Sequence, residues 1–353
     1  MRICGVLLAG GIGSRFWPIS RKDKPKQFLL NFDGRTFIRS TADRFKKAIE
    51  PISGGFDLFI VTQERYAQLA KNEVPEATIL LEKEARNTAP AIALSVAQAL
   101  IRDVDVMVVM PSDHVFESEE PFIESLRKGV EEANRTESII VFGYEPLYPH
   151  NGYGYIEVGG VVDSCQTARD VIRFHEKPDT ETAKAYLATG KFLWNMGVFC
   201  WSISTILEAF RSVLPEFYDC VRLVADAIKA KRFEEVYTHL GSLPSSSIDK
   251  ALIEVAKNVR AIPVPKCGWS DVGNLSVWID LVENSKNNHS QAICLDCADV
   301  KAYADSGLVV TLGVKSLVVV KHGEVVLVCD ANRLQDVSII PKVLAEKGLD
   351  RFA

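Results

Sequence analysis

The chain has 353 residues, of which 47% are hydrophobic and 25% are charged, and its formal net charge at pH 7 is −5. This length predicts more than one structural unit, and the composition is that of a globular protein with a sizeable core. The acidic balance disfavours nucleic acid or an anionic membrane as the main partner, and no apolar run reaches the roughly 18 residues needed to cross a bilayer. The N-terminus also lacks the order of a signal peptide, so we expect a cytoplasmic protein.

The first part of the chain alternates short apolar runs, which are typical of buried strands, with amphipathic segments, which are typical of helices. Strands are predicted at residues 3–8, 56–62, 78–81, 104–110 and 138–142. Helices are predicted at residues 36–49, 64–72, 88–101 and 122–133. This order predicts an α/β fold with a Rossmann-like, mostly parallel sheet that carries helices on both faces. Ligands bind such sheets at the carboxyl ends of the strands.

The rest of the chain changes character near residue 290. Before that point we expect strands at residues 153–158, 171–176, 193–201 and 258–264, helices between 203 and 233, and further helices at 248–256 and 275–283. After it, short β-rich pieces recur at 292–295, 300–304, 308–312, 317–320 and 325–328, followed by a helix at 337–346. The polar segment 284–290 is the best candidate linker. We therefore predict two domains, residues 1–287 and a small β-rich domain over residues 288–353 that resembles a short β-helix.

A glycine-rich stretch follows the first predicted strand. Gly10, Gly11 and Gly13 can adopt backbone conformations that are closed to other residues, and such a loop can fold its N–H groups around an anion. Five basic side chains follow between Arg15 and Lys26, against one acidic side chain. This local surplus of positive charge predicts a polyphosphate site. The alternative is a glycine turn followed by a solvated basic loop.

Two familiar phosphate loops are excluded by the residues present. The dinucleotide fingerprint requires a third glycine where Phe16 stands, and the P-loop requires Gly-Lys-Ser/Thr where this chain has Gly-Ser-Arg. What remains is Gly-Gly-x-Gly-x-Arg followed by Pro25-Lys26, which resembles the signature of the sugar-phosphate nucleotidyltransferases.

Further motifs narrow this resemblance. The segments at residues 17–18, 25–28, 86–92, 111–114 and 152–155 are similar, in order, to motifs of the mannose-1-phosphate guanylyltransferases. The resemblance implies transfer of GMP from GTP to mannose 1-phosphate, which gives GDP-mannose and pyrophosphate, with Mg²⁺ as the cofactor. A homodimer is a further possibility. The alternatives are a nucleotidyltransferase for another sugar 1-phosphate or nucleotide, and a non-catalytic subunit that senses nucleotide sugars.

Catalysis of this kind requires cations and a metal ion, because two polyanions must meet. Arg15 and Lys26 are the expected phosphate-binding cations, with Arg21 and Lys24 as weaker candidates. Asp113 follows a predicted buried strand and Asp271 lies in a loop, and the resemblance assigns both to Mg²⁺. The alternative for Asp271 is a helix N-cap. For His114, next to Asp113, a structural role is preferred.

The resemblance also implies a set of substrate contacts. Glu176 and Asn195 are the expected readers of the sugar hydroxyl groups, and Lys177 is expected to contact the sugar phosphate. The remaining expected substrate-binding residues are Ala9, Gly10, Gly11, Gly13, Glu82, Arg86, Asn87, Thr88, Ser112, Gly154 and Gly197. From the residues alone, Asn87 or Thr88 is a helix N-cap. Lys83 and Ala85 stand where relatives commonly have proline and glycine.

Eight cysteines are scattered along the chain, mostly within apolar runs where a reduced cysteine acts as a small hydrophobic residue. Cys294 and Cys297 have the spacing of a metal-ligand pair, but the sequence has no second such pair and no histidine cluster. Positions on a strand are therefore the preferred interpretation for both of them, over a zinc site or a redox role.

Overall fold

We analysed a computed structural model of the chain, which describes residues 1–30, 33–161, 168–283 and 290–353. The chain separates into two compact units. The first unit comprises Met1–Gly10, Thr41–Ser112 and Phe116–Trp269, and the second comprises Gly11–Ser40, Asp113–Val115 and Ser270–Ala353. The glycine-rich and basic stretch thus belongs with the C-terminal strands. Most of the expected linker, residues 284–289, lies outside the described residues.

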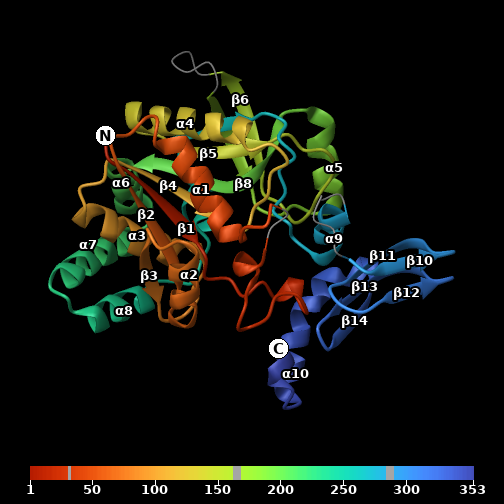
Figure 1. The fold of residues 1–353 in the computed structure, drawn as a ribbon. Coiled ribbons are helices and arrows are strands. Elements are labelled where there is room, and N and C mark those ends of the chain that lie inside the picture. Colours follow the sequence, from red (N-terminus) through yellow and green to blue (C-terminus); the bar gives the residue numbers. More distant parts are fainter. Residues whose placement is uncertain (31–32, 162–167, 284–289) are drawn as a thin grey trace. The chain divides into compact units, whose positions relative to one another are not determined.

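In the described residues, the first unit is built on a nine-stranded sheet with the order β3-β2-β1-β4-β8-β5-β9-β7-β6. Strands β1 to β6 and β8 are labelled in Figure 1. Its strands are β1 (Ile3–Leu8), β2 (Phe56–Gln63), β3 (Thr78–Glu82), β4 (Val106–Pro111), β5 (Ile139–Tyr144), β6 (Tyr155–Val161), β7 (Arg169–His175), β8 (Phe192–Ser202) and β9 (Val259–Val264). The helices between them are α1 (Phe37–Ile49), α2 (Ala67–Glu73), α3 (Thr88–Ile101), α4 (Glu120–Arg135), α5 (Thr180–Thr189), α6 (Ile203–Val213), α7 (Pro215–Lys229) and α8 (Phe233–Ser242). The α/β fold is therefore confirmed.

The directions of two strands, β8 and β7, could not be read from the sequence. The neighbours β3, β2, β1 and β4 run parallel, as the alternation of strands and helices predicts. However, β8 pairs antiparallel with both β4 and β5 and so joins two parallel parts of the sheet. The strand β7 likewise pairs antiparallel with both β9 and β6. A buried apolar strand looks the same in either direction, because periodicity reports burial and not polarity.

Helices cover both faces of this sheet, because successive residues of β1 contact helices on opposite sides. Cys4 and Val6 of β1 belong to a large core with residues of α3, α6 and α7. Gly5, between them, faces the opposite way, where a Cβ would lie 2.8 Å from the ring of Phe45 in α1. In the same way, a Cβ at Gly129 of α4 would meet the ring of Phe142 in β5. Helices therefore pack on both sides, as expected for a sheet whose strands are apolar on both faces.

The second unit carries the C-terminal strands and a core of its own. Its elements are α9 (Leu275–Glu283), β10 (Ala292–Leu295), β11 (Ala298–Ala304), β12 (Val309–Leu312), β13 (Lys315–His322), β14 (Val325–Asp330), the 3₁₀ segment η5 (Ala331–Ile339) and α10 (Ile340–Glu346). Alternate strands pair in parallel, β10 with β12 and β11 with β13, while β14 runs antiparallel to β13. Pairing of alternate strands is what a short coiled β-structure produces, and it confirms the expected β-rich C-terminal part.

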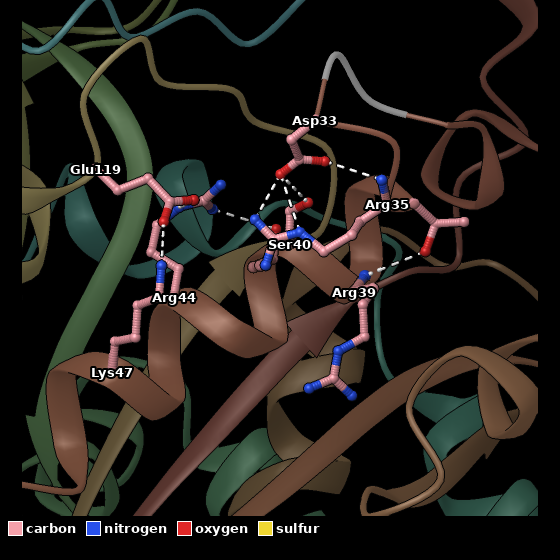
Figure 2. Close-up of polar contacts among 9 residues, drawn as sticks. Asp33, Arg35, Arg39, Ser40, Arg44, Lys47 and Glu119 are labelled. Carbon is pink, nitrogen blue, oxygen red and sulfur yellow. Dashed lines mark hydrogen bonds and ion pairs between the residues drawn. The ribbon is translucent and has the colours of Figure 1, made fainter.

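The first residues of α1, up to Ser40, belong to the second unit, and local hydrogen bonds define where this helix starts (Figure 2). Thr36 Oγ1 accepts from Arg39 N at 3.3 Å, which is the pattern of an N-cap. Asp33 accepts hydrogen bonds from Arg35 N at 2.9 Å and Ser40 Oγ at 3.3 Å. Further along α1, in the first unit, Glu119 pairs with the side chains of Arg44 and Lys47. Among the described residues, no helix is both long and apolar enough to cross a membrane.

Candidate active site

The glycine-rich loop begins in the first unit, at the end of β1, where its carbonyl groups are tied back to neighbouring strands. Three successive carbonyl oxygens each accept a side-chain hydrogen bond: Leu8 O from Ser112 Oγ at 2.7 Å, Ala9 O from Thr62 Oγ1 at 2.9 Å, and Gly10 O from Gln63 Nε2 at 2.9 Å. Gly10 also lies close to Glu82, since a Cβ there would be 2.9 Å from Glu82 Oε2. The carbonyl oxygens of residues 8–10, which would repel an anion, thus point toward neighbouring side chains of the protein.

The same arrangement continues in the second unit. Gly11 O accepts from Gln27 Nε2 at 3.0 Å, and Ile12 O accepts from Ser20 Oγ at 2.8 Å. Within the part of the chain that the structure describes, the N–H groups of residues 11–15 have no hydrogen-bond acceptor. A run of N–H groups whose carbonyls are held on the other side is a concavity suited to an anion.

Gly13 is the member of the loop that requires glycine. Its backbone has a φ of +69°, and a Cβ there would lie 2.8 Å from Lys26 Cβ and 3.2 Å from Lys26 N. Gly11 differs, because a Cβ at that position would meet nothing within 4 Å. Of the three glycines, Gly13 is therefore the one that adopts a positive φ, whereas Gly10 and Gly11 have φ values that other residues can adopt.

Lys26 joins the two aspartates predicted from the sequence. Its Nζ donates to Asp113 Oδ2 at 2.8 Å and to the backbone oxygen of Asp271 at 2.6 Å. The Lys26 side chain is only 5% exposed, while 34% of the Asp113 side chain is exposed. The ammonium group also lies over the ring of Phe16, 4.8 Å from its centroid. Residues 26, 113 and 271, which are far apart in the sequence, thus meet within the second unit.

The charges around Asp113 keep it ionised. Burial alone would raise the pKa of Asp113, but the charges of Lys26 and His114, the Lys26 hydrogen bond and the charge of Arg15 outweigh burial and lower it. Arg15 itself is exposed, and its Nη1 makes a hydrogen bond of 3.4 Å with Gln335. A buried cation held by an ionised carboxylate, with an exposed cation nearby, is an arrangement that can bind phosphate oxygens.

The alternative interpretation of Asp271 as a helix cap does not hold. Asn274 Oδ1 accepts from Val277 N at 3.2 Å, so Asn274 is the residue that caps α9. Asp271 lies further upstream, in a loop where Val272 has a positive φ of 47°. Among the described residues, no group of three or more His, Cys, Asp or Glu side chains that could hold a metal ion occurs.

The residues expected to contact the sugar lie together in the first unit. Asn195 N donates to Gly154 O at 2.8 Å, and a Cβ at Gly154 would lie 2.8 Å from Glu176 Oε2. Glu176 pairs with Lys177 at 3.1 Å, and these two side chains are 12% and 63% exposed respectively. Gly197, with a φ of +64°, donates its N–H to Asn195 Oδ1 at 3.0 Å. The structure therefore brings this predicted group into one place.

The expected substrate-binding residues at positions 82 and 86–88 divide into two kinds. Glu82 and Arg86 line a cavity of about 280 Å³ in the first unit, together with Tyr237 and Leu240 of α8. Burial raises the pKa of Glu82 to about 7. Asn87, whose φ is 68°, caps α3 and accepts from Thr88 N at 2.9 Å. The residue of this loop with a positive φ is thus Asn87. Ala85, which stands where relatives commonly have glycine or proline, does not have to adopt such a conformation.

Several residues of the site were missed by sequence reasoning. The carbonyls of the glycine-rich loop are held by Gln27, Ser20, Thr62 and Gln63, and nothing in the sequence distinguishes the last three from other polar residues. Only Gln27 had a signal, because it lies in the Pro-Lys-Gln-Phe motif. Arg21 donates to Pro18 O and His322 O, which gives it contacts of a structural kind in the second unit.

The cysteine pair is placed at the edge of the short strands. Cys294 lies on β10, opposite Thr311 of β12, and is exposed. Cys297 follows the strand, and its thiol donates to Leu295 O at 3.2 Å. Among the described residues neither thiol belongs to a metal-binding cluster. The expected strand position is therefore confirmed for Cys294, whereas Cys297 lies just beyond β10.

Comparison with known proteins agrees with this architecture. The nucleotidyl transferase family model matches residues 4–288, and the model of the MannoseP isomerase/GMP-like beta-helix domain matches residues 290–344. The mannose-1-phosphate guanylyltransferase of Escherichia coli strain K12 is 35% identical over 360 residues, which span 97% of this chain and 73% of that protein. The xanthan biosynthesis protein XanB of Xanthomonas campestris pv. campestris is 34% identical with the same coverage.

A solved structure extends the similarity to three dimensions. The crystal structure described as mannose-1-phosphate geranyltransferase from Thermus thermophilus has a TM-score of 0.85 and 30% sequence identity, and it covers 98% of this chain and 100% of that one. The agreement includes both the α/β sheet and the β-rich C-terminal part. The chain therefore belongs to the nucleotidyl transferase family, within the group of the mannose-1-phosphate guanylyltransferases.

Proposed function

We propose that this chain is an enzyme that transfers GMP from GTP to mannose 1-phosphate, with release of pyrophosphate and formation of GDP-mannose. Membership of the guanylyltransferase group supports the reaction. The observation that carries the proposal is the second unit's Lys26, which binds both Asp113 and the backbone of Asp271 beside the glycine-rich loop. No described feature of the molecule favours a non-catalytic sensor.

The chemistry of this reaction makes charge the main difficulty. A phosphate monoester already carries a charge of about −1.5 to −2 at neutral pH, so no general base is needed to create the nucleophile. Its approach to a triphosphate brings like charges together. At a separation of about 4 Å and an effective dielectric constant near 20, each pair of unit charges costs about 4 kcal/mol. The enzyme must therefore supply positive charge and N–H donors at fixed positions.

We assign this work to residues 11–15 and to two cations. The N–H groups of the loop would bind the phosphates of GTP. The exposed Arg15 would stabilise the negative charge that develops on the leaving pyrophosphate. Lys26 is buried and paired, so we assign it a double role. It holds Asp113 in a fixed position and contributes one positive charge to the phosphate site.

We further propose that Asp113 and Asp271 hold Mg²⁺. The pair fits this ion, because Mg²⁺ is commonly bound by one or two carboxylates together with phosphate oxygens. The lowered pKa of Asp113 keeps that carboxylate available at neutral pH. When bound, the ion would neutralise phosphate charge. The contribution of the chain is to hold the Asp113 carboxylate through Lys26 Nζ, which also binds the backbone oxygen of Asp271.

In the first unit, the sugar and base contacts follow from hydrogen-bonding capacity. Glu176 would accept hydrogen bonds from sugar hydroxyl groups, Asn195 would both donate and accept, and the exposed Lys177 would bind the sugar phosphate. Glu82 and Arg86, in the cavity of about 280 Å³, would read the edge of the base. A homodimeric state stays a prediction, which light scattering on the eluting protein would test.

A substrate panel tests the proposed function. Pyrophosphate release should be measured with GTP, ATP, UTP and dTTP, each combined with mannose 1-phosphate or glucose 1-phosphate. We expect the highest kcat/KM for GTP with mannose 1-phosphate, and loss of activity on chelation that added Mg²⁺ restores. A preference for UTP or dTTP would refute the guanylyl assignment, and full activity in excess chelator would refute the metal assignment.

A further inference from the structure

The first unit contains a carboxylate that no sequence motif singled out, at the start of the short π-helix η4 (Asp249–Ile253). Asp249 Oδ1 accepts a hydrogen bond of 2.8 Å from Asn195 Nδ2. The other end of the same amide is held as well, because Asn195 Oδ1 accepts from Gly197 N at 3.0 Å. An amide with a partner at each end cannot rotate without losing both, so these two contacts fix the orientation of Asn195.

The backbone that carries Asp249 is itself well supported. Ser246 O accepts from Ala89 N at 3.0 Å, and Ile248 N donates to Thr88 Oγ1 at 2.8 Å. These bonds tie the segment before Asp249 to the first turn of α3. Glu254 N then donates to Asp249 O at 2.9 Å, five residues back along the chain. The sequence predicts a helix over residues 248–256, and the structure has a short π-helix there, a form that often occurs at functional sites.

Asp249 also lies within the electrostatic reach of the other sugar-site residues. Burial, and after it the charge of Glu176, raise the pKa of Asp249 to about 6, whereas the hydrogen bond from Asn195 and the charge of Lys177 act in the opposite direction. Asn195, Glu176 and Lys177 are the three side chains assigned to the sugar 1-phosphate. Asp249 is therefore part of the same group, although nothing in the proposed reaction requires it to touch the substrate.

We propose that Asp249 is a positioning residue that fixes the amide of Asn195 for recognition of the sugar 1-phosphate. This inference rests on the proposed function, because it needs Asn195 to contact that substrate. An amide has two N–H bonds and two oxygen lone pairs, so after Asp249 and Gly197 are satisfied one of each is left for sugar hydroxyl groups. Without Asp249 the amide can turn over and present its groups in the wrong order.

The test uses the full chain with the variants Asp249→Ala and Asp249→Asn. Initial rates of pyrophosphate release are measured with one substrate saturating and the other varied. The alanine variant loses the acceptor, so we expect its KM for mannose 1-phosphate to rise about tenfold or more, while its KM for GTP stays within about twofold. The asparagine variant keeps an acceptor oxygen at the same place, so it should restore most of the KM for mannose 1-phosphate. A merely structural role would not separate the two KM values.

Lys250→Ala is the matched control, because Lys250 is the next residue of the same turn and its side chain is exposed. Both of its KM values should equal those of the wild type. If the alanine variant does not fold, Asp249→Ser, whose side chain is shorter, takes its place beside Asp249→Asn. The proposal is overturned if both KM values rise together, if neither changes, or if asparagine does not rescue. If the wild-type protein shows no activity with mannose 1-phosphate, the proposed function is overturned instead. The role of Asp249 is then decided by the KM values of the variants for the sugar 1-phosphate that the protein does use.

Discussion

Replacement of Asp113 by Asn should separate catalysis from folding. Asp113 Oδ2 accepts from Lys26 Nζ at 2.8 Å, and the two side chains are 34% and 5% exposed respectively. A hydrogen bond to a charged group contributes about 1.5–3 kcal/mol, but solvent screens the exposed third of Asp113 and the asparagine oxygen can still accept. We therefore expect the free energy of unfolding to fall by about 1–2 kcal/mol.

The loss in rate should be larger. Removal of one preorganised group that stabilises transition-state charge typically lowers kcat by about 10²–10³-fold, which is about 3–4 kcal/mol. Steady-state pyrophosphate release gives kcat, and urea denaturation followed by circular dichroism gives stability. Asp280→Asn is the control: Asp280 forms an ion pair with Lys301 in the same unit, and its loss should leave kcat unchanged.

The pH dependence of the stability difference has a definite sign. Because the folded-state pKa of Asp113 is lowered, its contribution is fully present above its ordinary value of 3.8 and is lost as the pH falls through the folded-state pKa. The wild type and the Asp113→Asn variant should therefore differ in stability at pH 7 and converge in strong acid. The assignment of Asp113 to the site fails if kcat falls by less than about tenfold while stability falls as expected.

Three further predictions concern single positions. Gly13→Ala should destabilise the fold by about 1–2 kcal/mol and lower activity, because its φ is +69° and the new Cβ would meet Lys26, whereas Gly11→Ala should leave the urea midpoint unchanged. Glu82→Gln should stabilise the protein at pH 8.5 by at most about 3 kcal/mol and have little effect at pH 4.5. The reason is that burial raises the pKa of the Glu82 carboxyl to about 7, so its favourable contribution to stability is lost as the pH rises through that value. Equal urea midpoints for the variant and the wild type at both pH values would contradict this. Asn274→Ala should cost about 1 kcal/mol through loss of the α9 cap and leave kcat intact, and a large loss of kcat in thermally stable protein would show that Asn274 does more than cap the helix.

Much of the local structure was determined by the sequence alone. The apolar run at residues 3–8 became β1, and the segment at residues 88–101 became α3 with the expected bounds, because burial periodicity and capping residues act over a few positions. The glycine-rich loop with its basic continuation pointed to phosphate chemistry for the same reason. Its glycine and charged residues are neighbours in the sequence.

The tertiary structure decided everything that depends on distant partners. Lys26 lies 87 positions from Asp113 and 245 from Asp271, so their meeting follows from the path of the chain and not from any local pattern. The antiparallel direction of β8 and the contact of Asp249 with Asn195, 54 positions away, arise in the same way. A side-chain hydrogen bond depends on position to within a few tenths of an ångström, and only the packed core fixes positions that closely.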